Sequence, residues 1–440
     1  MVMALAAVAG ALAAVAWASS PLTVIGLAVL LMMCRRAVRD LTGRELRWVT
    51  GVLSIGVGAR LVALCAVFLT TDPAAGQFKA LIPDGRFAIQ RSLIMLSLWR
   101  GDVIGPWYQL VVFDTYGGQT YHRFLAYVQW FVGPSPYGIV LLSVCAFTAA
   151  ALLLFTLARP RFGPRAALAG FVVLMFWPSW FAWSVSMLKE STVLLLGTIV
   201  VWGGVHLVNR RRSPLAAAAI AIGVAGLFAM RDGVALIPAA GTVIGLASAL
   251  AFRRSAVALG VVGGGALVFT LAAAQPAAQT FVATQVRAAA SRHIGHVYSF
   301  GYGYRIVDQR FYSGWPEAPW TMDFEEGVRF LTRAAAAFIL VPLPWQLPPA
   351  VTIAFLPEQI AWYALVLLML PGFWWGIRRS PQLTMALAGC CAAGMAVIAP
   401  NSGNIGTLIR HRDMIVPFLV WLSAAGAVRL TEGRRMHGLD

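Results

Sequence analysis

Residues 48–70 read WVTGVLSIGVGARLVALCAVFLT, a run in which Arg60 is the only charged side chain. About 20 consecutive apolar residues cross a hydrocarbon layer roughly 30 Å thick as a helix. The run therefore predicts a transmembrane helix, and similar runs recur along the chain. Hydrophobic residues make up 60% of the sequence and charged residues 12%, against about 25% charged in soluble domains. The composition predicts an all-α polytopic membrane protein.

The basic residues show which side of the membrane each helix end faces. The net charge is +17, but the arginines form short clusters after apolar runs, which is the positive-inside pattern. This distribution argues against nucleic acid as a partner. About 12 spans with both termini in the cytoplasm give the inner side a charge of about +14 and the outer side about +3. Most acidic residues then lie outside, which predicts a working face there.

Apart from the spans, the sequence predicts a short N-terminal element and two external loops. Residues 1–34 contain two apolar runs broken by Ser19-Ser20-Pro21, which favours a helical hairpin, with one kinked helix as the alternative. Residues 48–430 form one membrane domain with external loops at 71–136 and 275–333. The first loop carries amphipathic pieces around 87–99 and 121–132. Prolines interrupt residues 334–355, which predicts a partial or re-entrant hairpin.

No metal-binding pattern is evident. The five cysteines lie in or at the ends of apolar runs without a CxxC pair, and we interpret them as small core residues. His293 and His296 form an i, i+3 pair. A zinc site needs further ligands and none is evident, so a structural role is favoured for both.

The first loop contains Leu81-Ile82-Pro83-Asp84-Gly85-Arg86-Phe87. Pro and Asp-Gly are turn residues, and the turn aims the Asp84 carboxylate. This carboxylate suits a general base for an acceptor hydroxyl or a ligand for a divalent cation, Mg²⁺ or Mn²⁺. The alternative is an Asx turn that only shapes the loop. Arg86 and Arg91 suit a phosphate group or the lipid headgroups.

Two outer helix ends carry paired charges. Lys189 and Glu190 are adjacent, so they do not face each other on a helix. In one interpretation, one of them points into the site while the other marks the interface. In the alternative, the pair snorkels at the membrane boundary. Arg231 and Asp232 occupy the same kind of position at the next outer end.

Arg410, His411 and Arg412 precede the last apolar run on the outer side. The polar, glycine-containing segment 401–406 lies just before them and permits close backbone approach. Two arginines near a helix N-terminus suit a phosphate or diphosphate. The alternative, a basic flank against lipid, is weaker because the charge rule does not call for arginines on this side.

Several segments together resemble the GT-C superfamily of polyprenyl-phosphate-sugar-dependent glycosyltransferases. The superfamily includes protein O-mannosyltransferases and the lipid A aminoarabinose transferases. The first matching features are Arg60 in the first long helix, Asp84 early in the first loop and the aromatic segment 121–133. Next come Leu157-Ala-Arg159-Pro-Arg161-Phe162-Gly163, and Phe176-Trp177-Pro178-Ser179 followed by Lys189-Glu190. The last are Pro342-Leu-Pro344-Trp345, and Arg410 with Arg412. Two departures leave metal use and acceptor type open. Many relatives carry a Tyr where this chain has Phe87, and Gly85 replaces the second acid of some mannosyltransferases.

The resemblance implies a GT-C-like fold and an inverting transfer at the outer face of a bacterial plasma membrane. The donor would be a polyprenyl-phosphate sugar in the lipid bilayer, and the acceptor a glycan, lipid or protein of the cell envelope. Asp84 would be the catalytic base or a metal-linked acid. The donor phosphate would be held by Arg410 and Arg412, with Lys189 or Arg231. The cavity would be lined by Arg86, Asp114, Glu190 and His411.

Two other functions are alternatives, and the sequence separates the first of them poorly from the glycosyltransferase. An O-antigen-type polymerase or ligase also uses outer-face arginines, but acts on diphosphate-linked glycans. A transporter or flippase predicts buried charges in mid-span and paired repeats. The sequence shows no repeat, and Arg60 is nearly alone in mid-span.

Overall fold

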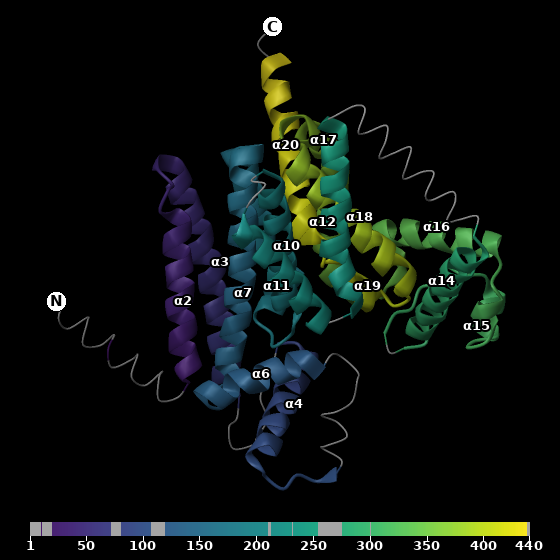
Figure 1. Ribbon diagram of the computed structural model, residues 1–440, viewed down its shortest axis with the longest axis horizontal. Helices are drawn as coiled ribbons and strands as arrows, with labels where there is room; N and C mark the ends of the chain where they lie inside the picture. The colour runs from purple at the N-terminus through teal and green to yellow at the C-terminus, as the bar shows by residue number, and fades with distance from the viewer. Residues whose placement is uncertain are drawn as a thin grey trace. The chain divides into compact units, whose positions relative to one another are not determined.

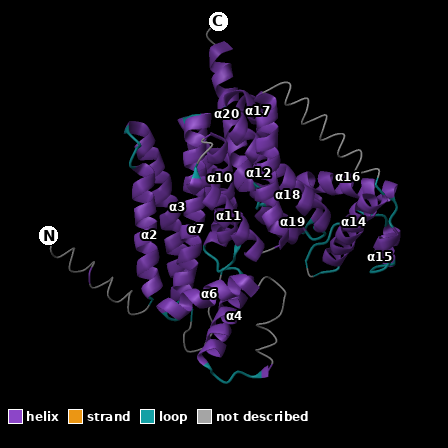
Figure 2. Cartoon of the chain, in the orientation of Figure 1, coloured by secondary structure: helices purple, strands orange, loops and turns teal. Residues whose placement is uncertain are grey.

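A computed structural model describes residues 10, 20–71, 81–106, 119–209, 213–230, 232–253, 275–299 and 301–437. Over these residues the regular structure is helical, apart from one isolated bridge between Gly303 and Asn404 (Figure 2). The predicted all-α class is thereby confirmed for the described chain.

Within the described residues, six helices are long and apolar enough to span a membrane. They are α2 (Pro21–Val38), α3 (Gly43–Leu69), α7 (Pro136–Phe162), α10 (Glu190–Asn209), the Phe355–Arg379 part of α17 (Pro349–Arg379), and α18 (Pro381–Ile398), whose candidate span runs to Asn401. Two bent pairs raise the number to eight: α8 (Pro164–Phe176) with α9 (Pro178–Ser184), and α19 (Ile405–Arg412) with α20 (Val416–His437). Two shorter apolar helices are α11 (Pro214–Met230) and the Ile237–Ala251 part of α12 (Asp232–Arg253). The membrane-protein class follows, and the count of about 12 stays a prediction.

The chain divides into two compact units. Unit 1 holds Met1–Pro160, Phe171–Trp202 and Ala218–Ala235, and unit 2 holds Arg161–Gly170, Gly203–Ala217 and Leu236–Asp440. The predicted domain bounds, 1–34 and 48–430, stay predictions. Most of residues 1–19 and the predicted span 255–274 lie outside the described residues.

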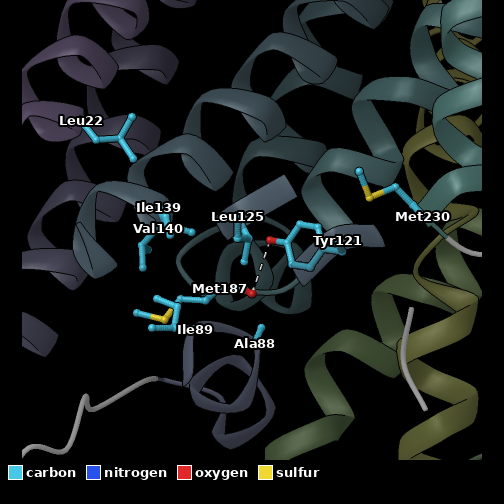
Figure 3. Packing of buried hydrophobic residues seen from close by; sticks show 9 residues of the cluster. All are labelled: Leu22, Ala88, Ile89, Tyr121, Leu125, Ile139, Val140, Met187 and Met230. Atoms are coloured by element: carbon cyan, nitrogen blue, oxygen red, sulfur yellow. Dashed lines mark hydrogen bonds between the residues drawn. The ribbon is translucent and has the colours of Figure 1, made fainter. Parts of the chain in front are cut away.

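In unit 1, both amphipathic pieces predicted in the first loop are helices. They are α4 (Pro83–Arg100) and α6 (Gln119–Val132), and they pack against each other. Figure 1 shows α6 lying crosswise to the long helix α7. A buried apolar cluster joins these helices to α7 and to the link between α9 and α10, with Ile89, Leu125, Val140 and Met187 among its members (Figure 3). The described helices of the first loop are therefore packed onto the ends of the spans.

The apolar run 166–184 is long enough to predict one span. In the structure it is broken between α8 and α9, which meet at 61°. Pro178 lacks the backbone N–H that would continue the hydrogen-bond ladder. Arg60 of α3 fills the break: its Nη2 donates to the Met175 carbonyl oxygen over 3.0 Å and its Nε to Ser184 Oγ over 2.7 Å. Arg60 is fully buried, so this mid-span charge is a structural donor that satisfies a helix end.

Unit 2 is built on α17, α18 and α20, which pack together. Glycines allow the backbones to approach closely, as small residues do in membrane helix pairs. A Cβ at Gly372 of α17 would lie 1.8 Å from the Leu422 carbonyl oxygen of α20. A Cβ at Gly426 of α20 would lie 2.1 Å from the Leu368 carbonyl oxygen. These two positions accept no side chain.

The described part of the second loop contains helices joined by irregular stretches, and it belongs to unit 2. It contains α14 (Pro276–Val297), α15 (Gln309–Ser313) and the first part of α16 (Phe324–Leu340), with a 3-10 turn at Ala318–Thr321. Asp323 and Glu326 form a capping box at the start of α16. Residues 334–355 comprise the end of α16, an irregular stretch with a 3-10 turn at Pro344–Gln346, and the start of α17. The partial or re-entrant hairpin expected there stays a prediction.

Candidate functional site

Asp84 lies in the first turn of α4, where its carboxylate is exposed. A negative charge at this end is favoured by the helix dipole. The next residue, Gly85, is buried against the link between α9 and α10, because a Cβ at Gly85 would lie 3.1 Å from the Met187 backbone nitrogen. The structure therefore places Asp84 beside the link that carries Lys189.

The link between α9 and α10 comprises residues 185–189, so the predicted charge pair lies where the link meets α10. Lys189 is half-buried just before α10, and Glu190 is the first residue of α10 with 2% exposure. A glutamate in the first turn stabilises the helix through its dipole. The two side chains thus differ in environment, as expected for adjacent residues.

Tyr121 of α6 ties the first loop to this link. Its hydroxyl donates its one proton to the Leu188 carbonyl oxygen over 3.1 Å and to that of Met187 over 3.4 Å. Figure 3 shows the contact with Met187. Burial, and then the nearby charge of Glu190, raise the pKa of the Tyr121 phenol above its usual range. Glu190 therefore lies close to Tyr121.

His122 is a site residue that the sequence did not single out. It is 7% exposed on the same buried side of α6 as Tyr121. Burial, and then the positive charges of Arg91 and Lys189, lower its pKa to about 4. A neutral imidazole therefore lies near two cations at pH 7. In the sequence, the burial of His122 is indicated only by the helical period of residues 119–132. In a helix, His122 lies on the same side as Leu125 and Gln129, next to Tyr121.

We call Asp84, Arg91, His122, Lys189 and Glu190 the first-loop site. It combines an exposed carboxylate, two half-buried cations, a neutral histidine and a buried carboxylate. Two cations near one point can bind an anionic group such as a phosphate. An exposed carboxylate in the first turn of α4 can accept a proton from a hydroxyl. All five residues belong to unit 1.

The sequence predicts three other residues for the site: Arg86, Asp114 and Arg231. Arg86 is half-buried in the first turn of α4, two residues from Asp84. Asp114 and Arg231 lie outside the described residues.

Arg412, in unit 2, points into the protein. It is 2% exposed, and its Nη1 donates to the Val341 carbonyl oxygen over 2.9 Å. Its Nη2 donates to Gln359 Oε1 over 2.8 Å, and the guanidinium carbon lies 4.5 Å from the Trp362 ring centre. Arg412 therefore holds the end of α16 against α17. Its predicted phosphate contact stays a prediction that competes with these acceptors.

Arg410 and His411, also in unit 2, are half-buried in the last turn of α19. This short helix is capped by Asn404, whose Oδ1 accepts from the Gly406 backbone N–H over 2.9 Å. The predicted roles of Arg410 in phosphate binding and of His411 in the cavity stay predictions.

The two loop histidines hold backbone carbonyl groups. His293 Nδ1 lies 2.6 Å from the Ser402 carbonyl oxygen, and His296 Nδ1 lies 2.8 Å from that of Asn401. Among the described residues no group of three His, Cys, Asp or Glu side chains is placed to bind a metal ion. A cation at Asp84 stays a prediction from the family resemblance.

Comparison with protein-family models, with curated proteins and with solved structures finds no match to this chain. The function of this chain is therefore inferred from its own residues.

Proposed function

We propose that this chain is a membrane glycosyltransferase that moves a sugar from a polyprenyl-phosphate donor to a hydroxyl of a cell-envelope acceptor. The supporting observation is the first-loop site, in which Asp84 begins a helix packed on the link that carries Lys189 and Glu190. The GT-C-like fold, the count of about 12 spans, the outer active face and the bacterial plasma membrane belong to the same proposal.

In this proposal Lys189 and Arg91 bind the phosphate of the donor. The acceptor oxygen forms a bond to the anomeric carbon, the bond from that carbon to the phosphate oxygen breaks, and the acceptor proton passes to Asp84. The leaving group is a phosphate anion, so it needs positive charge more than a general acid. Positioned cations and one base supply what this step requires.

Glu190 and His122 act on the site from its buried side. Glu190 lies close to Tyr121 and helps to hold the charge balance around Lys189. His122 is neutral at pH 7 because of burial and the two cations, so it is available as a hydrogen-bond partner without adding a third positive charge. Neither residue needs to touch the sugar for the proposed step.

The test is sugar transfer by the purified full chain in nanodiscs, with undecaprenyl-phosphate-linked hexose and pentose as probes. Asp84→Asn removes the base with little change in shape and should abolish transfer. Asp102→Asn is the matched control, because Asp102 is also an exposed acid of the first loop. It should keep normal turnover. An Asp84→Asn variant that transfers sugar as well as the wild type would refute the assignment.

The donor separates this proposal from a polymerase or ligase. A polyprenyl-monophosphate sugar should serve as donor, and a diphosphate-linked glycan should not. Transfer from the diphosphate-linked glycan alone would favour the O-antigen-type reaction instead.

A further inference from the structure

The outward face of α6 has an unusual composition. Its exposed residues are Thr120, Arg123, Phe124, Tyr127, Trp130 and Phe131. The four aromatic side chains are 40% to 84% exposed, with Phe131 the most exposed. No acidic residue occurs in this helix.

The polar residues of α6 lie partly on its buried side. His122 is 7% exposed and Gln129 is fully buried, where its Nε2 donates to Ser92 Oγ of α4 over 2.9 Å. A helix facing water shows the opposite pattern, with charged and polar residues outward. The aromatic face therefore needs an apolar or interfacial neighbour.

The chain places this face at the end of a membrane span. α6 ends at Val132 and the span α7 begins at Pro136, so the two helix ends are at most about 14 Å apart. Gly133, with φ 84°, turns the chain between them. Figure 1 shows α6 crossing the direction of α7. A helix that crosses a span at its end lies along the membrane surface.

We propose that the aromatic face of α6 (Phe124, Tyr127, Trp130 and Phe131) lies in the headgroup region of the lipid bilayer and anchors the first loop there. Tryptophan and tyrosine concentrate at this depth, and interfacial helices combine apolar rings with basic residues such as Arg123. The buried face of the same helix holds the link through Tyr121. The anchor thus keeps the link that carries Lys189 at the level of the lipid phosphates.

The test places a fluorescent label on the full chain in liposomes of phosphatidylcholine and phosphatidylglycerol. The five native cysteines are replaced by alanine or serine, and Phe131→Cys carries a bimane label. Ile55→Cys is the matched control, because Ile55 is 64% exposed in the middle of the span α3. Monodisperse elution of each labelled protein shows that it is folded.

The label at position 131 should lose most fluorescence with lipids brominated close to the headgroup. The label at position 55 should lose most with lipids brominated near the acyl-chain ends. Quenching of the label at position 131 by iodide in the water, with no effect of either lipid, would overturn the proposal because the face would be in solvent. No quenching by iodide or lipid would also overturn it, since the face would then be covered by protein.

Discussion

The side chains of Arg60 and Ser184 meet in the core of unit 1, although 124 residues separate them: Arg60 Nε donates to Ser184 Oγ over 2.7 Å. The other guanidinium nitrogens donate to the carbonyl oxygens of Gly56 and Met175. The guanidinium also lies 4.4 Å from the ring centre of Phe147. One arginine therefore connects α3 to both sides of the break between α8 and α9.

Arg60→Lys should destabilise the protein despite keeping the charge. An ammonium group cannot reach three acceptors in fork geometry, and each buried acceptor left unsatisfied costs about 1–3 kcal/mol. Ser184→Ala should cost about 2 kcal/mol, since the hydroxyl that accepts from Arg60 Nε and donates to the Phe181 carbonyl oxygen is lost. The free energy of unfolding in one detergent measures both effects. Arg44→Lys, at an exposed position of α3, is the control, and an Arg60→Lys variant as stable as this control would contradict the argument.

The sequence predicts the helices well and the arginine contacts poorly. Hydrophobic length is a local signal and predicts the helix at 214–230. The same signal predicts one span at 166–184, where the structure has a break near Pro178. Arg412 reads as an outward cation because it precedes an apolar run. Its acceptors, Val341 and Gln359, lie 71 and 53 residues away. No local pattern reports such partners, and the same limit applies to His122, whose cationic neighbours come from other elements.

Arg412→Lys should lower the stability of unit 2 by about 2 kcal/mol, because a lysine replaces two hydrogen bonds with one and loses the stacking on Trp362. Arg429→Lys is the matched control, since Arg429 is exposed on α20. Thermal unfolding of both variants in one detergent is the measurement. Equal melting temperatures for the two variants would show that the Arg412 contacts contribute nothing.

Gly85→Val should slow transfer without unfolding the protein. A side chain at this position meets the Met187 backbone and pushes the start of α4, with Asp84, away from the link. A displacement of about 1 Å costs up to roughly 100-fold in rate, so a loss of about 10- to 100-fold is expected. Gly58→Val is the control, because a Cβ at Gly58 meets nothing within 4 Å. Equal turnover of the two variants would show that the role of Asp84 in transfer does not depend on the packing of α4 against the link.

His293 should make unit 2 sensitive to acid. The Ser402 carbonyl oxygen can only accept, so Nδ1 carries the proton. The other nitrogen, Nε2, then accepts from the Tyr312 hydroxyl 3.2 Å away. That hydroxyl oxygen accepts in turn from the Ile306 backbone N–H over 3.0 Å. Protonation of Nε2 would remove an acceptor that the network uses.

The direction of the pH effect follows from this network. Burial lowers the pKa of His293 to about 4, below the value of about 6.5 in an unfolded chain. Between these values the unfolded state binds more protons, so stability falls as the pH falls. The full effect is on the order of 3 kcal/mol by pH 4. His293→Asn keeps a donor for Ser402 but lacks the Nε2 acceptor for the Tyr312 hydroxyl, so it should be less stable than the wild type at pH 7. The asparagine does not titrate. The deficit of this variant in the free energy of unfolding should shrink toward pH 5. Parallel stability profiles for the two proteins between pH 7 and pH 5 would show that His293 does not titrate there.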